Sequence, residues 1–144
     1  MSSLNLNITT ETMQFDEHGD IIPEDCLSSA PCARFDKKRN GWSLSFVERS
    51  EYGRTATRIS YDKKEKALTL TMKGNTQYTA LFKVGTPYEF IYAVPPVTFD
   101  AEVKPLSLSE SMSENGGEID LSYDLTLGGV YRRIHLHVLA TPAT

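Results

Sequence analysis

Five polar side chains share the parity of the apolar residues in their predicted strands, so each should point into the interior. Glu48 continues the inward parity of an apolar strand, and Arg132 shares the parity of its apolar neighbours on the last strand. Thr55, Thr57 and Tyr123 would add hydroxyl groups on the same face. Buried carboxylates and guanidiniums need partners. These residues therefore either lie at wet openings of the fold or line a polar interior that holds a small ligand.

His135 and His137 form a His-x-His pair, and their side chains point to the same side of one strand. Such a pair can begin a zinc site, but a structural zinc site needs four ligands. The third histidine, His18, lies in an acidic stretch that lacks the spacing of an EF-hand. The register predicted below places the His-x-His pair on the outer face, opposite polar residues. The sequence therefore predicts no metal site and no cofactor.

Motifs typical of covalent or phosphate chemistry are absent from the sequence. It contains neither a Gly-x-Ser-x-Gly nucleophile elbow nor a Gly-rich phosphate loop. Cys26 and Cys32 are separated by five residues, and without a secretory signal we expect both to be free thiols. An enzyme would have to use Glu48 as its acid or base. We therefore expect a protein that is not an enzyme.

Alternation of apolar and polar residues at period two runs through most of the chain. It is clearest over residues 4–8, 42–46, 68–72 and 119–127. Strict alternation predicts strands with one buried face. Turn signals recur about every ten residues, which favours a sandwich or a barrel. We expect residues 1–144 to form a single all-β domain, an antiparallel barrel of about eight to ten strands, with residues 16–31 as its one long connection.

The last hairpin has a register that matches both of its faces. A two-residue turn at 128–129 sets Leu121 opposite Leu136 on the apolar face and Asp124 opposite Arg133 on the polar face. A slip of one residue would destroy both matches.

Two further turns can be placed in the same way. A three-residue loop at 74–76 keeps the apolar residues of both flanking strands on one face, whereas a two-residue loop does not. A four-residue turn at 62–65 would set Ile59 opposite Leu68 and would point Thr55 and Thr57 inward.

Several motifs follow one another in an order that resembles a known family. They are Trp-x-Leu-x-Phe-x-Glu at 42–48, Thr-x-Thr-x-Ile at 55–59, Leu-x-Leu-x-Met-Lys-Gly at 68–74 and Asn-Gly-Gly-x-Ile-x-Leu-x-Tyr-x-Leu at 115–125. Over residues 41–139 the chain resembles the YwiB-like family of small bacterial proteins, whose function is uncharacterised. The resemblance implies a calycin-like, that is lipocalin-like, barrel. By analogy with other calycins, it also implies a ligand in the lumen.

Charge and hydropathy narrow the range of partners and compartments. The net charge is −4 and no run of Lys and Arg exceeds three residues, so we expect no nucleic-acid partner. The N-terminal stretch does not resemble a signal peptide, and no segment is long and apolar enough to span a membrane. We therefore expect a cytoplasmic protein without a membrane partner.

Three functional hypotheses remain open at this point. The first is a non-enzymatic barrel that binds a small apolar or amphipathic ligand in its lumen. The lumen residues would be Glu48, Thr55, Thr57, Tyr123 and Arg132. The second is a solid-cored barrel that acts as a protein-interaction module. The third is an enzyme that uses Glu48 for acid or base catalysis. A cavity in the barrel would favour the first, and a filled interior the second.

Overall fold

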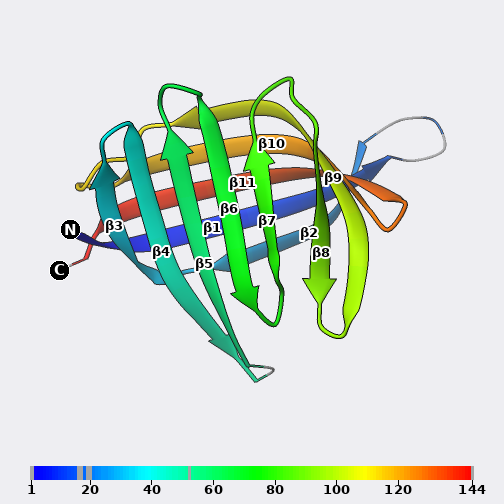
Figure 1. Cartoon of the computed structure of the whole chain (residues 1–144), viewed down its shortest axis with the longest axis horizontal. Coiled ribbons are helices and arrows are strands. Elements are labelled where there is room, and N and C mark those ends of the chain that lie inside the picture. Colours follow the sequence, from blue (N-terminus) through cyan, green and yellow to red (C-terminus); the bar gives the residue numbers. More distant parts are fainter. Residues whose placement is uncertain (1, 16–17, 19–20, 52, 144) are drawn as a thin grey trace.

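Eleven antiparallel strands form one sheet that curves into a nearly closed barrel (Figure 1). The computed structural model describes residues 2–15, 18, 21–51 and 53–143, and of residues 21–25 it describes the backbone alone. The strands are β1 (Ser2–Phe15), β2 (Ile21–Ser29), β3 (Cys32–Lys38), β4 (Gly41–Ser50), β5 (Gly53–Asp62), β6 (Ala67–Gly74), β7 (Tyr78–Phe82), β8 (Tyr88–Val94), β9 (Val97–Glu110), β10 (Gly117–Leu127) and β11 (Val130–Pro142). The predicted all-β barrel is confirmed, with one strand more than expected.

Strands β7 and β8 are the two ends of the sheet, and they meet to close the barrel. The strand order is β7-β6-β5-β4-β3-β1-β11-β10-β9-β8, with β2 paired to β1 outside this path. At the seam, Gln77 and Ala93 exchange two backbone hydrogen bonds with N···O distances of 2.8 and 2.9 Å. Beside this bridge the Tyr78 ring stacks on the Tyr92 ring, with centroids 5.1 Å apart. Ring packing therefore closes the seam where the backbone ladder does not.

Inward side chains form cross-strand rows that fill one end of the barrel. The first three rows across β4, β5, β6 and β7 are Trp42, Tyr61, Leu68, Phe82; then Leu44, Ile59, Leu70, Ala80; then Phe46, Thr57, Met72, Tyr78. Trp42 is 1% exposed, and its indole Nε1 donates a hydrogen bond of 2.6 Å to Glu110 Oε1. This hydrogen bond satisfies the one polar atom of a large buried ring. We call the end that carries Trp42 the packed end.

The predicted register of the last hairpin is confirmed. Leu121 lies opposite Leu136, and Asp124 lies opposite Arg133. The Arg133 guanidinium donates to both carboxylate oxygens of Asp124, over 2.8 and 3.3 Å. The predicted pairing around residues 74–76 is also confirmed, since Leu70 lies opposite Ala80.

The turn between β5 and β6 lies one residue later than predicted, so the pairing is shifted by two. Ile59 lies opposite Leu70, and the ladder ends at the pair of Asp62 and Ala67. The Asp62 carboxylate accepts hydrogen bonds from the backbone N–H groups of Lys64 and Glu65, so this residue opens the turn instead of lying inside it. The shift is even, so the inward face of β5 is as predicted.

Part of the predicted long connection is a strand. Residues 21–29 form β2, which pairs with β1 from Ile8–Ser29 to Phe15–Ile21, with a register shift between Thr12 and Met13. The stretch has no clear alternation, but backbone ladder hydrogen bonds do not depend on side-chain type. The prediction of a connection over all of 16–31 was therefore wrong for residues 21–29. None of the described segments is a helix that could cross a membrane.

Candidate ligand-binding cavity

A cavity of about 460 Å³ lies inside the barrel beyond the packed end. Its apolar lining consists of Ile8, Leu27, Phe46, Ile59, Leu70, Met72, Leu136 and Val138. Its polar lining consists of Thr10, Ser28, Ser29, Glu48, Thr57, Tyr78 and Tyr123. An apolar cavity of this size with a few convergent polar groups is the usual form of a small-ligand site.

The mouth of this cavity lies where the wall of the barrel splits. Strand β3 pairs with β4 only as far as Ser45, and β2 pairs with β1 alone. The end of β4 and the outer edge of β2 therefore face each other without a ladder between them, and in Figure 1 the ends of β4 and β5 diverge from β2. Both edges line the cavity, with Glu48 on β4 and Leu27 on β2. Leu27 is 63% exposed and gives the mouth an apolar lip.

Thr57 places an unsatisfied hydroxyl group on the cavity wall. The residue is 4% exposed, and its Oγ1 has no hydrogen-bond partner. Its neighbours in the ladder are Phe46 and Met72, so apolar side chains flank it on both sides. A buried hydroxyl without a partner costs about 1–3 kcal/mol relative to a satisfied one. No protein group bonds this oxygen, and it has less than 1 Å² of accessible surface, so a molecule in the cavity supplies its partner only if the wall around Thr57 shifts slightly.

Two tyrosines add neutral hydroxyl groups to the cavity lining. Burial is the main cause that raises the pKa of Tyr78 and of Tyr123, and neighbouring tyrosines raise both further. The Tyr123 ring packs edge-on against Phe82 at 4.8 Å, which fixes its orientation. Tyr123 lies inside the barrel and is half-buried, and the cavity lies against part of its surface. Both phenols therefore remain protonated near neutral pH and can donate a hydrogen bond.

Glu48 lies at the mouth, one row farther from the packed end than Phe46 and Thr57. It is half-buried, and it pairs across the ladder with Thr55. Among the described residues that line the cavity it is the one charged side chain.

The cavity brings together three of the five residues that the sequence suggested, namely Glu48, Thr57 and Tyr123. The other two are not among its described lining residues. Thr55 lies at the rim, and Arg132 donates a hydrogen bond of 2.8 Å to the backbone oxygen of Tyr131 near the turn between β10 and β11.

Four polar lining residues were not identified from the sequence. Tyr78 and Thr10 have the inward parity of their strands, and this parity could have revealed them. Ser28 and Ser29 belong to β2, which was not predicted as a strand, so no parity was available for them.

The two strand histidines lie on the outer face, as their parity predicts. His135 Nε2 lies 3.0 Å from Asp120 Oδ1, and its Nδ1 lies 3.9 Å from a carboxylate oxygen of Glu11. His137 Nε2 lies 3.5 Å from Glu118 Oε2. The ladder sets Asp120 opposite His137, so these contacts are diagonal, as the twist of a sheet favours. No described group of three or more His, Cys, Asp or Glu residues is arranged to hold a metal ion.

The two cysteines form no disulfide with a described residue, and both are exposed. Cys26 lies opposite Glu11 and Cys32 lies opposite Asn5 along the same edge of β1. Six residues of strand separate these positions, which is about 20 Å. An intramolecular disulfide would require β2 or β3 to leave the sheet.

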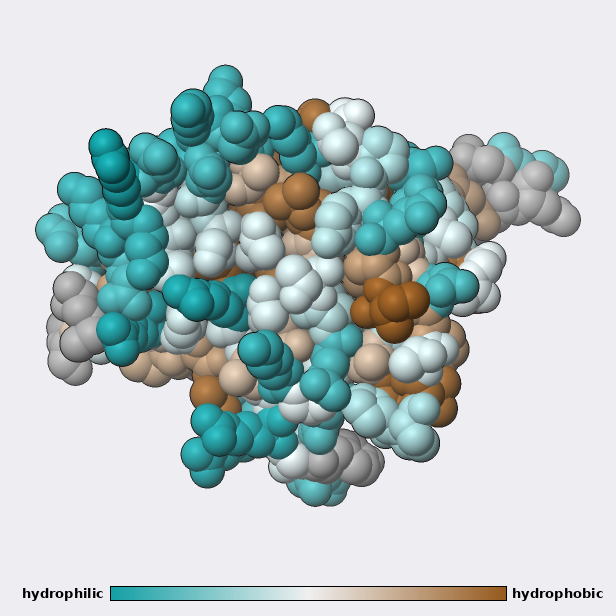
Figure 2. All heavy atoms as spheres, in the orientation of Figure 1, coloured by the Kyte–Doolittle hydropathy of each residue, from teal (hydrophilic) through white to brown (hydrophobic). Residues whose placement is uncertain are grey.

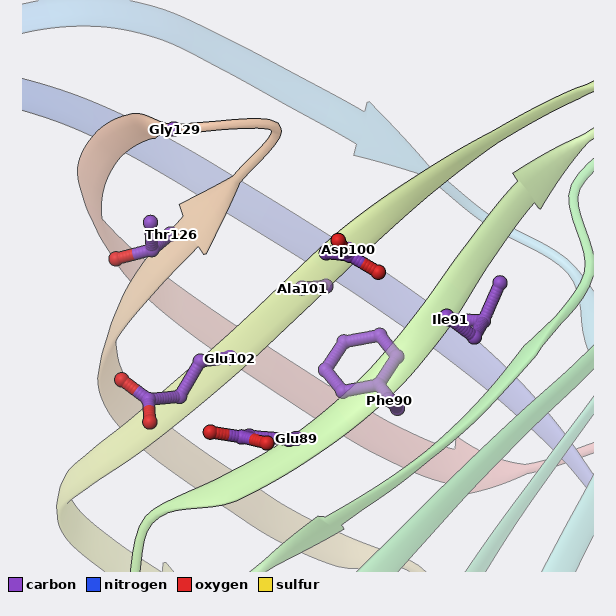
Figure 3. Close-up of a pocket in the computed structure, with 8 residues that line it drawn as sticks. All are labelled: Glu89, Phe90, Ile91, Asp100, Ala101, Glu102, Thr126 and Gly129. Carbon is purple, nitrogen blue, oxygen red and sulfur yellow. The ribbon is translucent and has the colours of Figure 1, made fainter.

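A second hollow, of about 660 Å³, lies on the outer side of β8 and β9. Figure 3 shows the carboxylates of Glu89 and Glu102 side by side on the two strands, and the ladder sets these two residues directly opposite each other. Asp100 adds a third carboxylate beside exposed Ile91. Figure 2 shows a largely hydrophilic face with apolar side chains over the region of β8 and β9. This hollow is a shallow surface feature without a buried polar group.

Comparison with known proteins identifies the family. A family profile described as a domain of unknown function, DUF1934, matches residues 6–137. The crystal structure of the ywiB protein from Bacillus subtilis superposes with a TM-score of 0.78 at 15% sequence identity, covering 99% of this chain and 93% of that one. At this identity the likeness shows the fold alone. No curated protein matches the sequence. The expected resemblance is confirmed, and the chain belongs to the family of the domain of unknown function DUF1934.

Proposed function

We propose that this protein is a non-catalytic carrier or sensor that binds a small amphipathic molecule in the cavity of its barrel. The unsatisfied hydroxyl group of Thr57 on an otherwise apolar wall is the observation that carries this proposal. An apolar ligand part gains by leaving water, and a polar ligand atom near Thr57 completes a hydrogen bond that the protein leaves open. A ligand makes both gains only if it has an apolar part and a polar group.

The cavity weighs against the alternative of a solid-cored interaction module, because that hypothesis required a filled interior. Acid or base catalysis by Glu48 has less support, since the described lining residues include no histidine, no cysteine and no second carboxylate to act with it. A single carboxylate at a wet mouth is poorly placed for chemistry, because general acid–base catalysis needs a second group that positions the reacting atom.

Titration with the neutral fluorescent probe N-phenylnaphthylamine tests the proposal. We expect saturable binding to the wild type and loss of binding in Thr10→Phe and Leu136→Phe, which fill the cavity from paired positions on β1 and β11. Ile91→Ser is the control, because it removes exposed apolar surface from β8 and leaves the cavity unchanged. Binding that survives both filling variants but is lost in Ile91→Ser would place the probe on the outer surface and contradict the proposal. Circular dichroism checks that each variant is folded.

A further inference from the structure

The described lining of the cavity carries a negative charge and no positive charge, which limits the kind of ligand that fits. Among the described residues no Lys, Arg or His lines the cavity, whereas Glu48 lines its mouth. Glu48 forms no ion pair with a described residue. A carboxylate on an apolar wall is more costly than one in water unless a cation or hydrogen-bond donors approach it.

The cations that are nearest to Glu48 in the sheet belong to the other face. Arg49 follows Glu48 directly and therefore points outward, and it pairs across the ladder with Arg54, which also points outward. Both arginines are exposed. The fold therefore surrounds this carboxylate with Phe46, Thr55 and the mouth of the cavity, and the inward face of β4 and β5 carries no cation among the described residues.

An anionic ligand fits this lining poorly. With its head group at the mouth it would face the like charge of Glu48. With its head group farther inside it would meet only neutral donors, the hydroxyl groups of Thr57, Tyr78 and Tyr123. Removing an anion from water without a compensating cation costs several kcal/mol, which neutral hydrogen bonds only partly offset.

We propose that the ligand is an amphipathic amine, whose ammonium group binds at Glu48 and whose apolar part extends into the cavity past Phe46 toward Ile59. This inference rests on the proposed function, because it names the chemical class of the ligand at the same site. The two rows from Glu48 to the level of Ile59 span four residues of β4, or about 13 Å. That length suits a medium-length alkyl chain, and Leu27 offers an apolar contact at the entrance.

Three matched probes test the inference: decylamine, decanol and decanoate, which share one alkyl chain and differ in the charge of the head group. Each displaces N-phenylnaphthylamine from the wild-type protein in a competition titration near neutral pH, below the concentration at which it forms micelles. We expect decylamine to bind about tenfold more tightly than decanol, since a hydrogen bond between charged groups raises affinity by roughly a factor of ten. Decanoate should bind least tightly, and added salt should reduce the preference because Glu48 is half-exposed.

Glu48→Gln removes the charge and keeps the shape of the side chain. In this variant the affinity for decylamine should fall to that for decanol, and the affinity for decanol should not change. Glu89→Gln is the matched control, because it changes the net charge by the same amount on the outer side of β8, away from the cavity. Its decylamine affinity should equal that of the wild type.

Equal binding of the three probes, a preference for decanoate, or an amine preference that survives Glu48→Gln would overturn the amine inference and leave cavity binding intact. Failure of all three probes and of N-phenylnaphthylamine to bind the folded wild type would instead overturn the proposed function itself.

Discussion

At the scale of single residues, Thr57 and Ser43 form an informative pair. Both carry a buried hydroxyl oxygen without a hydrogen-bond partner, but only Thr57 lines the cavity. We predict that Thr57→Val and Ser43→Ala each leave the free energy of unfolding of the ligand-free protein unchanged or raise it by about 1 kcal/mol, because each removes an unsatisfied polar atom. Denaturation in urea measures the change. A cost above about 1 kcal/mol for Thr57→Val would mean that its hydroxyl has a partner in the protein.

The same two variants should differ in their affinity for a ligand. We predict that Thr57→Val weakens decanol binding by about threefold to tenfold, the worth of one neutral hydrogen bond, while Ser43→Ala leaves it unchanged. Equal affinities in the two variants would show that the ligand does not reach Thr57.

Asp124 couples stability to pH. Its burial opposes ionisation, but hydrogen bonds from Arg133 and Tyr131, together with the positive charges of Arg133 and Lys104, outweigh burial and lower its pKa. The unfolded carboxyl, with a pKa near about 4, therefore takes up protons before the folded one, so this stabilisation is fully present above about pH 5 and is lost as the pH falls through the folded pKa.

We predict that Asp124→Asn lowers the free energy of unfolding by about 1 kcal/mol at neutral pH and flattens its fall toward acid pH. Asp100→Asn removes an equal charge at an exposed position on β9. It should leave the fall in the free energy of unfolding toward acid pH as in the wild type. Urea denaturation over a series of pH values makes the comparison. If the free energy of unfolding of Asp124→Asn falls toward acid pH as steeply as that of the wild type, the pH dependence comes from other groups.

At the scale of elements, the hairpin of β10 and β11 shows how far side-chain parity determines stability. Leu121 is fully buried, whereas His137 on the same ladder contacts Glu118 at the surface. We predict that Leu121→Ala costs about 2–5 kcal/mol and His137→Ala less than about 1 kcal/mol. Thermal or urea denaturation measures both. Similar costs at the two positions would contradict the register.

Where two strands alternate clearly, the sequence alone was enough to place them. The hairpin of β10 and β11 is such a case, because its apolar and charged faces both constrain the register. The β5–β6 turn was misplaced because several polar residues compete to start it, and only the hydrogen bonds accepted by Asp62 decide between them. Strand β2 was missed because its ladder with β1 relies on backbone groups, which are common to all sequences.

At the scale of the whole molecule, parity predicts the face on which a side chain lies but not its height in the barrel. Glu48, Thr57 and Tyr123 have the predicted inward orientation and line the cavity. Arg132 has the same parity on β11, but it lies near the β10–β11 turn. The cavity itself could not be predicted, because its volume depends on how far apart the walls lie and on the split between β2 and β4.

The closure of the barrel around its tyrosines determines its behaviour at alkaline pH. The pKa values of Tyr78 and Tyr123 are raised by burial, so in the folded barrel both keep their protons above the usual tyrosine range. An unfolded tyrosine ionises near about pH 10, so the unfolded chain loses these protons first and stability falls as the pH rises beyond that value.

We predict that the phenolate absorbance of these two residues appears late in an alkaline titration, together with the loss of the β-sheet signal in circular dichroism. Tyr123→Phe keeps the ring that packs on Phe82 and removes the hydroxyl. It should take one phenolate out of the late step and leave the earlier steps unchanged. If Tyr123 ionises while the sheet signal is still intact, the phenol is open to water through the cavity mouth, and the wall between β2 and β4 opens more widely than the static barrel shows.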